Sequence, residues 1–203
     1  MITKLMAAAG LALALAACTG PPPPAHTDAF TGLYNQSAAT VPTDAPVTLQ
    51  QPVGLIFSDN VEAYIGFVKD ANEYWGARVP ASLTNTVVLA DNDPMYFAGR
   101  VLAMLKRHFP SAQRVSDFKQ AVASGKKGVI VVDLRTKIGE PYGDRTTKYD
   151  IDLYFFNSAM NPVSKITGHG EYYVPYASAT GGVQKSIDAA VQQLDGKITA
   201  LVH

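Results

Sequence analysis

The single cysteine is the feature that most constrains how this chain can fold. Cys18 is the only cysteine among 203 residues, so no disulfide within the chain can hold the fold together. A structural zinc site built from several cysteines is excluded for the same reason. The chain must therefore rely on its own hydrophobic core, which 47% hydrophobic residues and a chain of this length make feasible.

The residues before Cys18 have the pattern of a cleavable export signal. Lys4 supplies a positive charge, and residues 6–17 form an unbroken apolar run. This run is shorter than the roughly 20 residues that span a bilayer as a helix, and Pro21 to Pro24 follow it almost at once. We therefore expect residues 1–17 to be a signal peptide rather than a membrane-spanning helix.

The sequence Leu15-Ala16-Ala17-Cys18 resembles the lipobox of bacterial lipoproteins. The resemblance implies that Cys18 is first given a diacylglyceryl group. A signal peptidase then cuts just before it, and Cys18 also carries a further acyl chain such as palmitate. Two or more chains make membrane attachment stable. Thr19, where an Asp would favour retention at the inner membrane of enteric-type bacteria, indicates the outer membrane. Ordinary secretory cleavage of an alanine-rich leader is the alternative.

The charge of the mature chain is close to zero. Of 17 basic residues, removal of Lys4 leaves 16, against 17 acidic residues. A nucleic-acid-binding domain would carry a basic stripe, so we expect no nucleic-acid partner. The expected partners are the membrane, through Cys18, and another envelope protein or further copies of the chain itself. The predicted location is the periplasmic face of the outer membrane.

A proline-rich linker is predicted between the lipidated cysteine and the folded domain. Residues 18–46 contain four consecutive prolines, which favour a semi-rigid polyproline II spacer. The linker is expected to be flexible, and residues 47–203 to form one periplasmic domain. The linker contains one apolar cluster, formed by Phe30, Leu33 and Tyr34. The alternative to a fully flexible linker is that this cluster docks on the domain or on a partner.

The hydrophobic pattern of the domain predicts both strands and helices. Strands are expected over 53–57, 86–90, 129–134, 149–156 and 163–173, the last two as a hairpin. Helices are expected over 64–75, from Pro94 to Phe109 with Asp93 as N-cap, over 116–124, and after Gly181-Gly182 to the C-terminal end. A run of strands followed by a helix indicates an α+β fold, with a mainly antiparallel sheet and helices packed on one face.

Candidate chemistry in the sequence is sparse. Gly168-His169-Gly170-Glu171 lacks the two-histidine spacing of a zinc protease, and strand alternation alone places Asp150 and Asp152 on one face. No Gly-x-Ser-x-Gly nucleophile elbow occurs. No catalytic residue, metal site or cofactor is therefore predicted.

Tyrosines are the predicted binding residues. Tyr172, Tyr173 and Tyr176 run from the end of a strand into a loop, and Tyr142 lies in a separate loop. Tyrosine is favoured at protein interfaces because its ring gives a large contact area with a polar end. The competing interpretation is that alternate tyrosines face the core and the others cover the sheet.

The order of these features resembles a broad group of small periplasmic lipoproteins. The group includes curli-secretion lipoproteins and the outer-membrane activators of peptidoglycan synthases, and the resemblance covers roughly residues 53–202. It implies an α/β domain that binds other envelope proteins without catalysis. We therefore expect a non-enzymatic binding or assembly component of an envelope complex. The alternative is a lipid-anchored periplasmic enzyme or ligand carrier with a polar site at the sheet edge, formed by Asp150, Asp152, His169 and Glu171.

Overall fold

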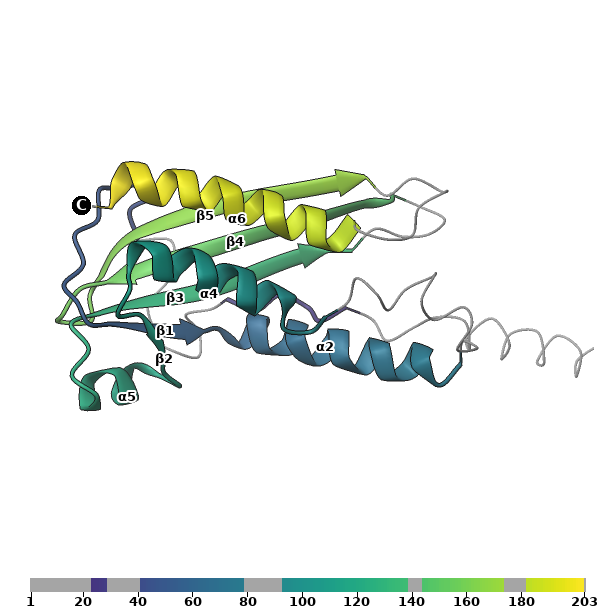
Figure 1. The fold of residues 1–203 in the computed structure, drawn as a ribbon, viewed down its shortest axis with the longest axis horizontal. Helices are drawn as coiled ribbons and strands as arrows, with labels where there is room; N and C mark the ends of the chain where they lie inside the picture. Colours follow the sequence, from purple (N-terminus) through teal and green to yellow (C-terminus); the bar gives the residue numbers. More distant parts are fainter. Residues whose placement is uncertain (1–22, 29–40, 79–92, 139–143, 174–181, 203) are drawn as a thin grey trace, which may run out of the picture.

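A five-stranded sheet forms the centre of the computed structural model (Figure 1), which describes residues 23–28, 41–78, 93–138, 144–173 and 182–202. The strand order is β2-β1-β3-β4-β5. Their bounds are β1 Val53–Phe57, β2 Gln113–Arg114, β3 Gly128–Lys137, β4 Thr146–Phe156 and β5 Pro162–Tyr173. β1 is parallel to β2 and β3, whereas the long β3, β4 and β5 pair antiparallel, so the sheet is mainly antiparallel.

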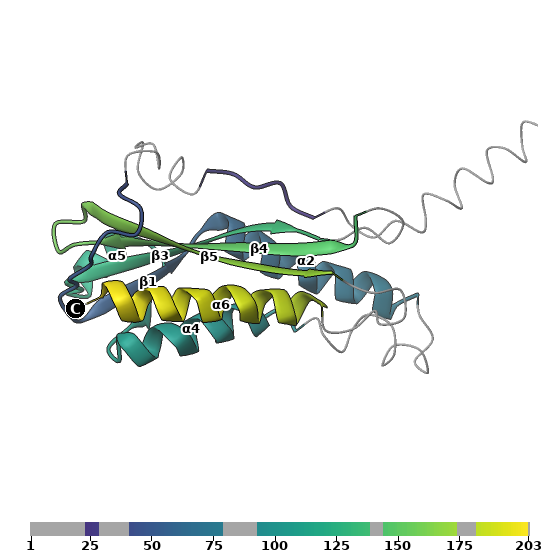
Figure 2. The ribbon, with the colours of Figure 1, turned by 90° about the horizontal axis from the view of Figure 1, so that it is seen from above.

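Helices cover one face of this sheet. The helices of the described residues are α2 Asp59–Gly76, α4 Tyr96–His108, α5 Phe118–Ala123 and α6 Gly182–Leu201. Figure 2 shows α4 and α6 side by side beneath the sheet, while α2 continues beyond the end of β1. The short α5 instead packs Ala121 against the opposite face, near Val129 and Phe156. The fold is α+β, as the sequence predicted.

The main core lies between the sheet and the helices. Inward side chains of β4 alternate as a half-buried strand requires: Tyr149, Ile151, Leu153 and Phe155 are all fully buried. From α4, Phe97 enters this core with no exposed surface and packs edge-on against Tyr64 of α2 at 6.1 Å between ring centroids. Tyr64 and Tyr149 also share a buried hydroxyl–hydroxyl hydrogen bond of 2.9 Å, which satisfies both polar groups.

Helix α6 lies unusually close to β5 because two glycines face it. Gly168 and Gly170 occupy the same face of β5 as the buried Ile166. A methyl group added at Gly170 would overlap the Ser186 carbonyl oxygen and lie 2.8 Å from the Ala190 nitrogen. Glycine at these positions therefore sets the distance between the helix and the sheet.

Most predicted elements are present, with differences at their ends. The hairpin of β4 and β5 is confirmed. Helix α4 begins at Tyr96 rather than Pro94, because the Asp93 carboxylate accepts from Met95 N at 2.9 Å in a turn before the helix. The short helix starts after Asp117, which caps Gln120 N, and Gly125 with φ +69° follows its end. Strand β2, only two residues long, was not predicted.

Parts of the predicted linker contact the folded domain. Residues 23–28, here called the strap, lie against β3 and the start of α2. Further on, Asp44 N donates to the Lys165 carbonyl at 2.8 Å, and Val47 is fully enclosed beside Val202. These contacts lie within or just after the range predicted to be flexible. The predicted signal peptide, the predicted strand 86–90, and several single residues lie outside the described residues: Cys18, Phe30, Leu33, Tyr34, Tyr142 and Tyr176.

Candidate functional site

The candidate site is a band of polar side chains on the sheet face turned away from α4 and α6. Near their Phe156 and Val129 ends, the strands bury apolar residues on this face against α5. Toward Lys137 and Tyr173, the same face carries charged side chains. Because β4 alternates, Asp150 and Asp152 point to this face while their neighbours enter the core.

Three of the four residues of the predicted polar site form one cluster. His169 Nδ1 lies 2.6 Å from Asp150 Oδ1, and His169 Nε2 lies 3.5 Å from Glu171 Oε2. Glu171 also pairs with Lys148 at 2.9 Å. His169 and Asp150 are direct partners in the β4–β5 register, so the pairing of the strands itself brings them together.

The electrostatics of this cluster favour charged side chains. The hydrogen bond to Asp150 raises the pKa of His169 above its ordinary value, and the contact with Glu171 acts in the same direction. Lys148 lowers the pKa of Glu171. Both nitrogens of the His169 ring face carboxylates, so the arrangement suits an imidazolium that donates twice. A general base needs an unprotonated nitrogen directed at a proton donor of the substrate, which this geometry does not present.

Asp152, the fourth residue, belongs to a separate and buried cluster. Its carboxylate accepts from Thr167 Oγ1 at 2.6 Å and pairs with Lys165 at 2.8 Å. Arg135 lies 3.4 Å away. The side chain of Asp152 is only 4% exposed, so its oxygens are already occupied and are not presented to solvent.

Asp133, which the sequence analysis missed, is the partner of Asp152 across the β3–β4 register. It is 2% exposed, and its carboxylate accepts from Ser58 Oγ at 2.6 Å and from Asn60 Nδ2 at 2.7 Å. His26 of the strap lies 3.2 Å from the other carboxylate oxygen. The signal for Asp133 was present as the only acidic residue within the apolar strand 129–134.

The polar band therefore consists of compensated charges. Each described carboxylate of the two clusters, and Asp133 beside them, has at least one cationic or neutral donor. Among the described residues, no group of three or more His, Cys, Asp or Glu side chains is arranged to hold a metal ion. The arrangement is that of a structural ion-pair network with an accessible outer part around His169.

Replacing Asp150 with asparagine is expected to lower the pKa of His169 toward 6.5, because the dominant hydrogen bond to a charged acceptor is lost. In the native protein the raised pKa means that His169 contributes stability fully below pH 6.5, and this contribution is lost as the pH rises through its folded-state pKa. NMR titration of the ring would measure the shift. An unchanged pKa in Asp150→Asn would contradict the assigned pairing.

The described tyrosines of the predicted binding set lie at the end of β5. Tyr172 accepts from Lys185 Nζ at 3.0 Å, and the same ammonium lies 4.6 Å from its ring centroid. Tyr173 is 56% exposed, and few other large apolar side chains among the described residues are exposed. Their role in binding remains a prediction.

An apolar cavity lies elsewhere, beside β1 and α4. It has a volume of about 140 Å³ and is lined by Leu55, Phe57, Met95, Ala98, Gly99, Leu102 and Arg114. The Arg114 guanidinium stacks over the Phe57 ring at 4.9 Å and also pairs with Glu62. No sequence motif marked this cavity, because its lining comes from three separated segments.

Fold and site together define an α+β domain whose polar band is held by internal ion pairs. No protein-family description and no curated protein matches the chain. Among solved structures, it is similar to the PelC dodecamer from Paraburkholderia phytofirmans, at 9% identity and a TM-score of 0.42. For a single-substitution variant of the same PelC, the identity is 8% and the TM-score is 0.44. Both matches cover 77% of this chain and 94% of the other. Values this low assign neither a family nor a function.

Among the residues that the structure describes, no helix combines the length and the apolar character that crossing a bilayer requires.

Proposed function

We propose that this protein is a periplasmic lipoprotein, anchored in the outer membrane through acylated Cys18, that serves as a non-enzymatic binding or assembly component of an envelope protein complex. The observation that carries the proposal is the lipobox Leu15-Ala16-Ala17-Cys18 behind a charged and apolar leader, with the only cysteine of the chain at the modified position. Diacylglyceryl and palmitate groups on Cys18 would anchor it.

The geometry of the domain supports binding over catalysis. The polar residues that were the best candidates for an active site are engaged with one another. Asp152 is buried under Lys165 and Thr167, and His169 is held between two carboxylates. An exposed tyrosine beside a tyrosine–lysine pair, in contrast, offers contact area without needing to react. The partner is proposed to be another envelope protein or further copies of this chain.

The anchor is tested by Cys18→Ala in the native host. The outer-membrane fraction is expected to fall more than about tenfold, because the acyl chains supply the attachment energy there. Fractionation of inner membrane, outer membrane and soluble periplasm, with labelling by radioactive palmitate, measures the result. The matched variant Thr19→Asp keeps the acyl chains and is expected to move the protein to the inner membrane. A Cys18→Ala protein that stays in the outer membrane would overturn the anchor.

The binding role is tested by crosslinking in the intact envelope followed by mass spectrometry. A reproducible protein partner, or crosslinks between identical copies, is the expected result. Recovery of lipid or small-molecule adducts alone would contradict the assembly role and favour the ligand-carrier alternative.

A further inference from the structure

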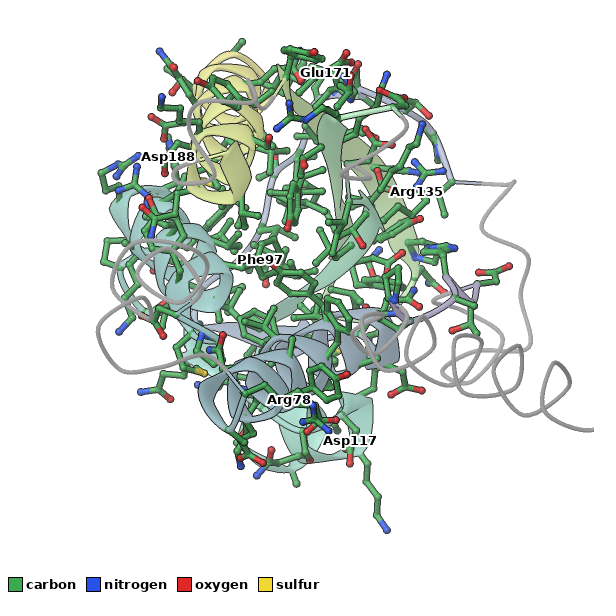
Figure 3. The ribbon with its side chains drawn as sticks, turned by 90° about the vertical axis from the view of Figure 1, so that its right-hand side faces the viewer. Arg78, Phe97, Asp117, Arg135, Glu171 and Asp188 are labelled. Atoms are coloured by element: carbon green, nitrogen blue, oxygen red, sulfur yellow. The ribbon has the colours of Figure 1, made fainter. Side chains whose placement is uncertain are left out.

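We infer that one end of the domain, where β3 and β5 finish and α6 begins, is held against the phospholipid surface by the docked strap. This end, here called the Tyr173 end, is bounded by Lys137, Tyr173 and Gly182. Figure 3 views the molecule from this side, with Arg78 labelled beyond the end of α2. The inference rests on the proposed acylation of Cys18 and deepens it, since it states how the anchored domain is oriented.

The strap is fixed to the domain by several specific contacts. Asn60 binds the backbone of Thr27 on both sides, accepting from Thr27 N at 2.9 Å and donating to Thr27 O at 2.7 Å. The same amide donates to the buried carboxylate of Asp133, which His26 also contacts. These bonds tie the strap to β3 and α2 at a point where the acceptors are buried.

The direction of the strap places its membrane-proximal end near the Tyr173 end. Thr27 lies at Asn60, close to the start of α2, and Pro24 lines a small space that extends from Asn60 and Tyr64 to Thr136, near the end of β3. Toward lower residue numbers, the strap therefore runs toward Lys137. Figure 2 shows this segment along the sheet on the side away from α6.

The length of chain between the strap and Cys18 is short. Five residue steps separate Cys18 from Pro23, which allows about 18 Å at full extension. A linker that was free as far as residue 46 would allow about 100 Å. Since β5 alone has 12 residues, and a strand rises about 3.3 Å per residue, the opposite end lies about 40 Å further along. The docked strap thus allows the Tyr173 end of the domain to reach the bilayer and keeps the opposite end away from it.

The side chains at the Tyr173 end suit a bilayer surface. Lys185 lies over the Tyr172 ring, and Arg78 lies 3.7 Å from the centre of the Tyr74 ring. Within the described part of the chain, neither cation forms an ion pair with a carboxylate, whereas Lys137 and Lys148 both do. Tyrosine with an adjacent cation is typical of membrane interfaces, because the ring sits at headgroup depth and the cation reaches the phosphates.

The experiment uses the full-length acylated protein with one introduced cysteine, which is the only free thiol because acylation consumes that of Cys18. Ala77→Cys places a fluorescent label at the Tyr173 end, and Ser158→Cys places it in the turn at the opposite end of the hairpin. Both positions are exposed. The labelled proteins are reconstituted into vesicles of phosphatidylethanolamine and phosphatidylglycerol that contain nitroxide-headgroup lipids, which quench nearby fluorophores.

Quenching at position 77 is expected to exceed that at position 158 by about threefold or more, given the roughly 40 Å between the two ends. Protein that sediments with the vesicles and is quenched equally at both positions overturns the orientation and leaves the anchor intact. Protein that fails to sediment overturns the anchor and the orientation together. Asn60→Ala, which releases the strap, is expected to keep sedimentation and lose the difference; an unchanged difference would refute the strap as its cause.

Discussion

Gly170→Ala is expected to lower the free energy of unfolding by more than about 3 kcal/mol, because the helix and the strand leave no room for a methyl group. The added carbon would overlap the carbonyl oxygen of Ser186, which is backbone and cannot rotate away. Helix α6 would have to move off β5, and the buried contacts of Ala190 and Leu194 would loosen with it. For a domain of this size the loss corresponds to a fall in Tm of about 10 °C.

Gly196→Ala is the matched control, since it makes the same chemical change within α6. No atom lies within 4 Å of the position that its new methyl group would take. Alanine loses less backbone entropy than glycine in a helix, so this variant is expected to gain about 0.5–1 kcal/mol. Urea unfolding of both variants, followed by circular dichroism, measures the difference. Equal stability of the two variants would contradict the close packing of α6 on β5.

The glycines also show which parts of the fold the sequence could reveal. The hairpin, the helices and the α+β class follow from the spacing of apolar residues, which is a local property of the chain. The segment Gly168-His169-Gly170 attracts attention for its histidine as a candidate chemical motif. Its two glycines carry a different signal, since two glycines on one face of a strand indicate a close approach by another element. The element that approaches, α6, is determined by the tertiary structure, and no local sequence pattern in α6 predicts that it packs on β5.

The candidate site could be predicted only in part, for a similar reason. Strand alternation correctly predicted that Asp150 and Asp152 share a face. The pairing of His169 with Asp150 depends on the register of β4 and β5, which the sequence did not predict. The sequence did not distinguish the exposed His169 cluster from the buried Asp152 cluster, because the cations that cover Asp152 come from neighbouring strands. It also assigned His26 to a free linker, whereas the residue contacts Asp133, more than a hundred positions away.

Asp152→Ala is expected to destabilise the protein by about 3 kcal/mol, because it leaves the half-buried cation of Lys165 without its carboxylate partner. The side chain of Lys165 is 20% exposed, and its ammonium lies between the Asp152 carboxylate and the ring of Tyr154. Removing the carboxylate also takes the acceptor from Thr167. Adding Lys165→Met should recover part of the loss, since methionine fills similar space without charge. A double-mutant cycle in urea measures this coupling.

The matched control is Glu171→Ala, which breaks an ion pair with Lys148 on the same face of the sheet. Both side chains are well exposed, so solvent screens their interaction and little change in stability is expected. If Asp152→Ala proved as mild as Glu171→Ala, the buried cluster would have no structural role.

The contrast also determines how the enzyme or ligand-carrier alternative must be tested. Replacing all four candidate residues would damage the fold through Asp152. Only Asp150, His169 and Glu171 can be replaced together to ask whether the exposed cluster acts on a ligand, with Asp152 left in place.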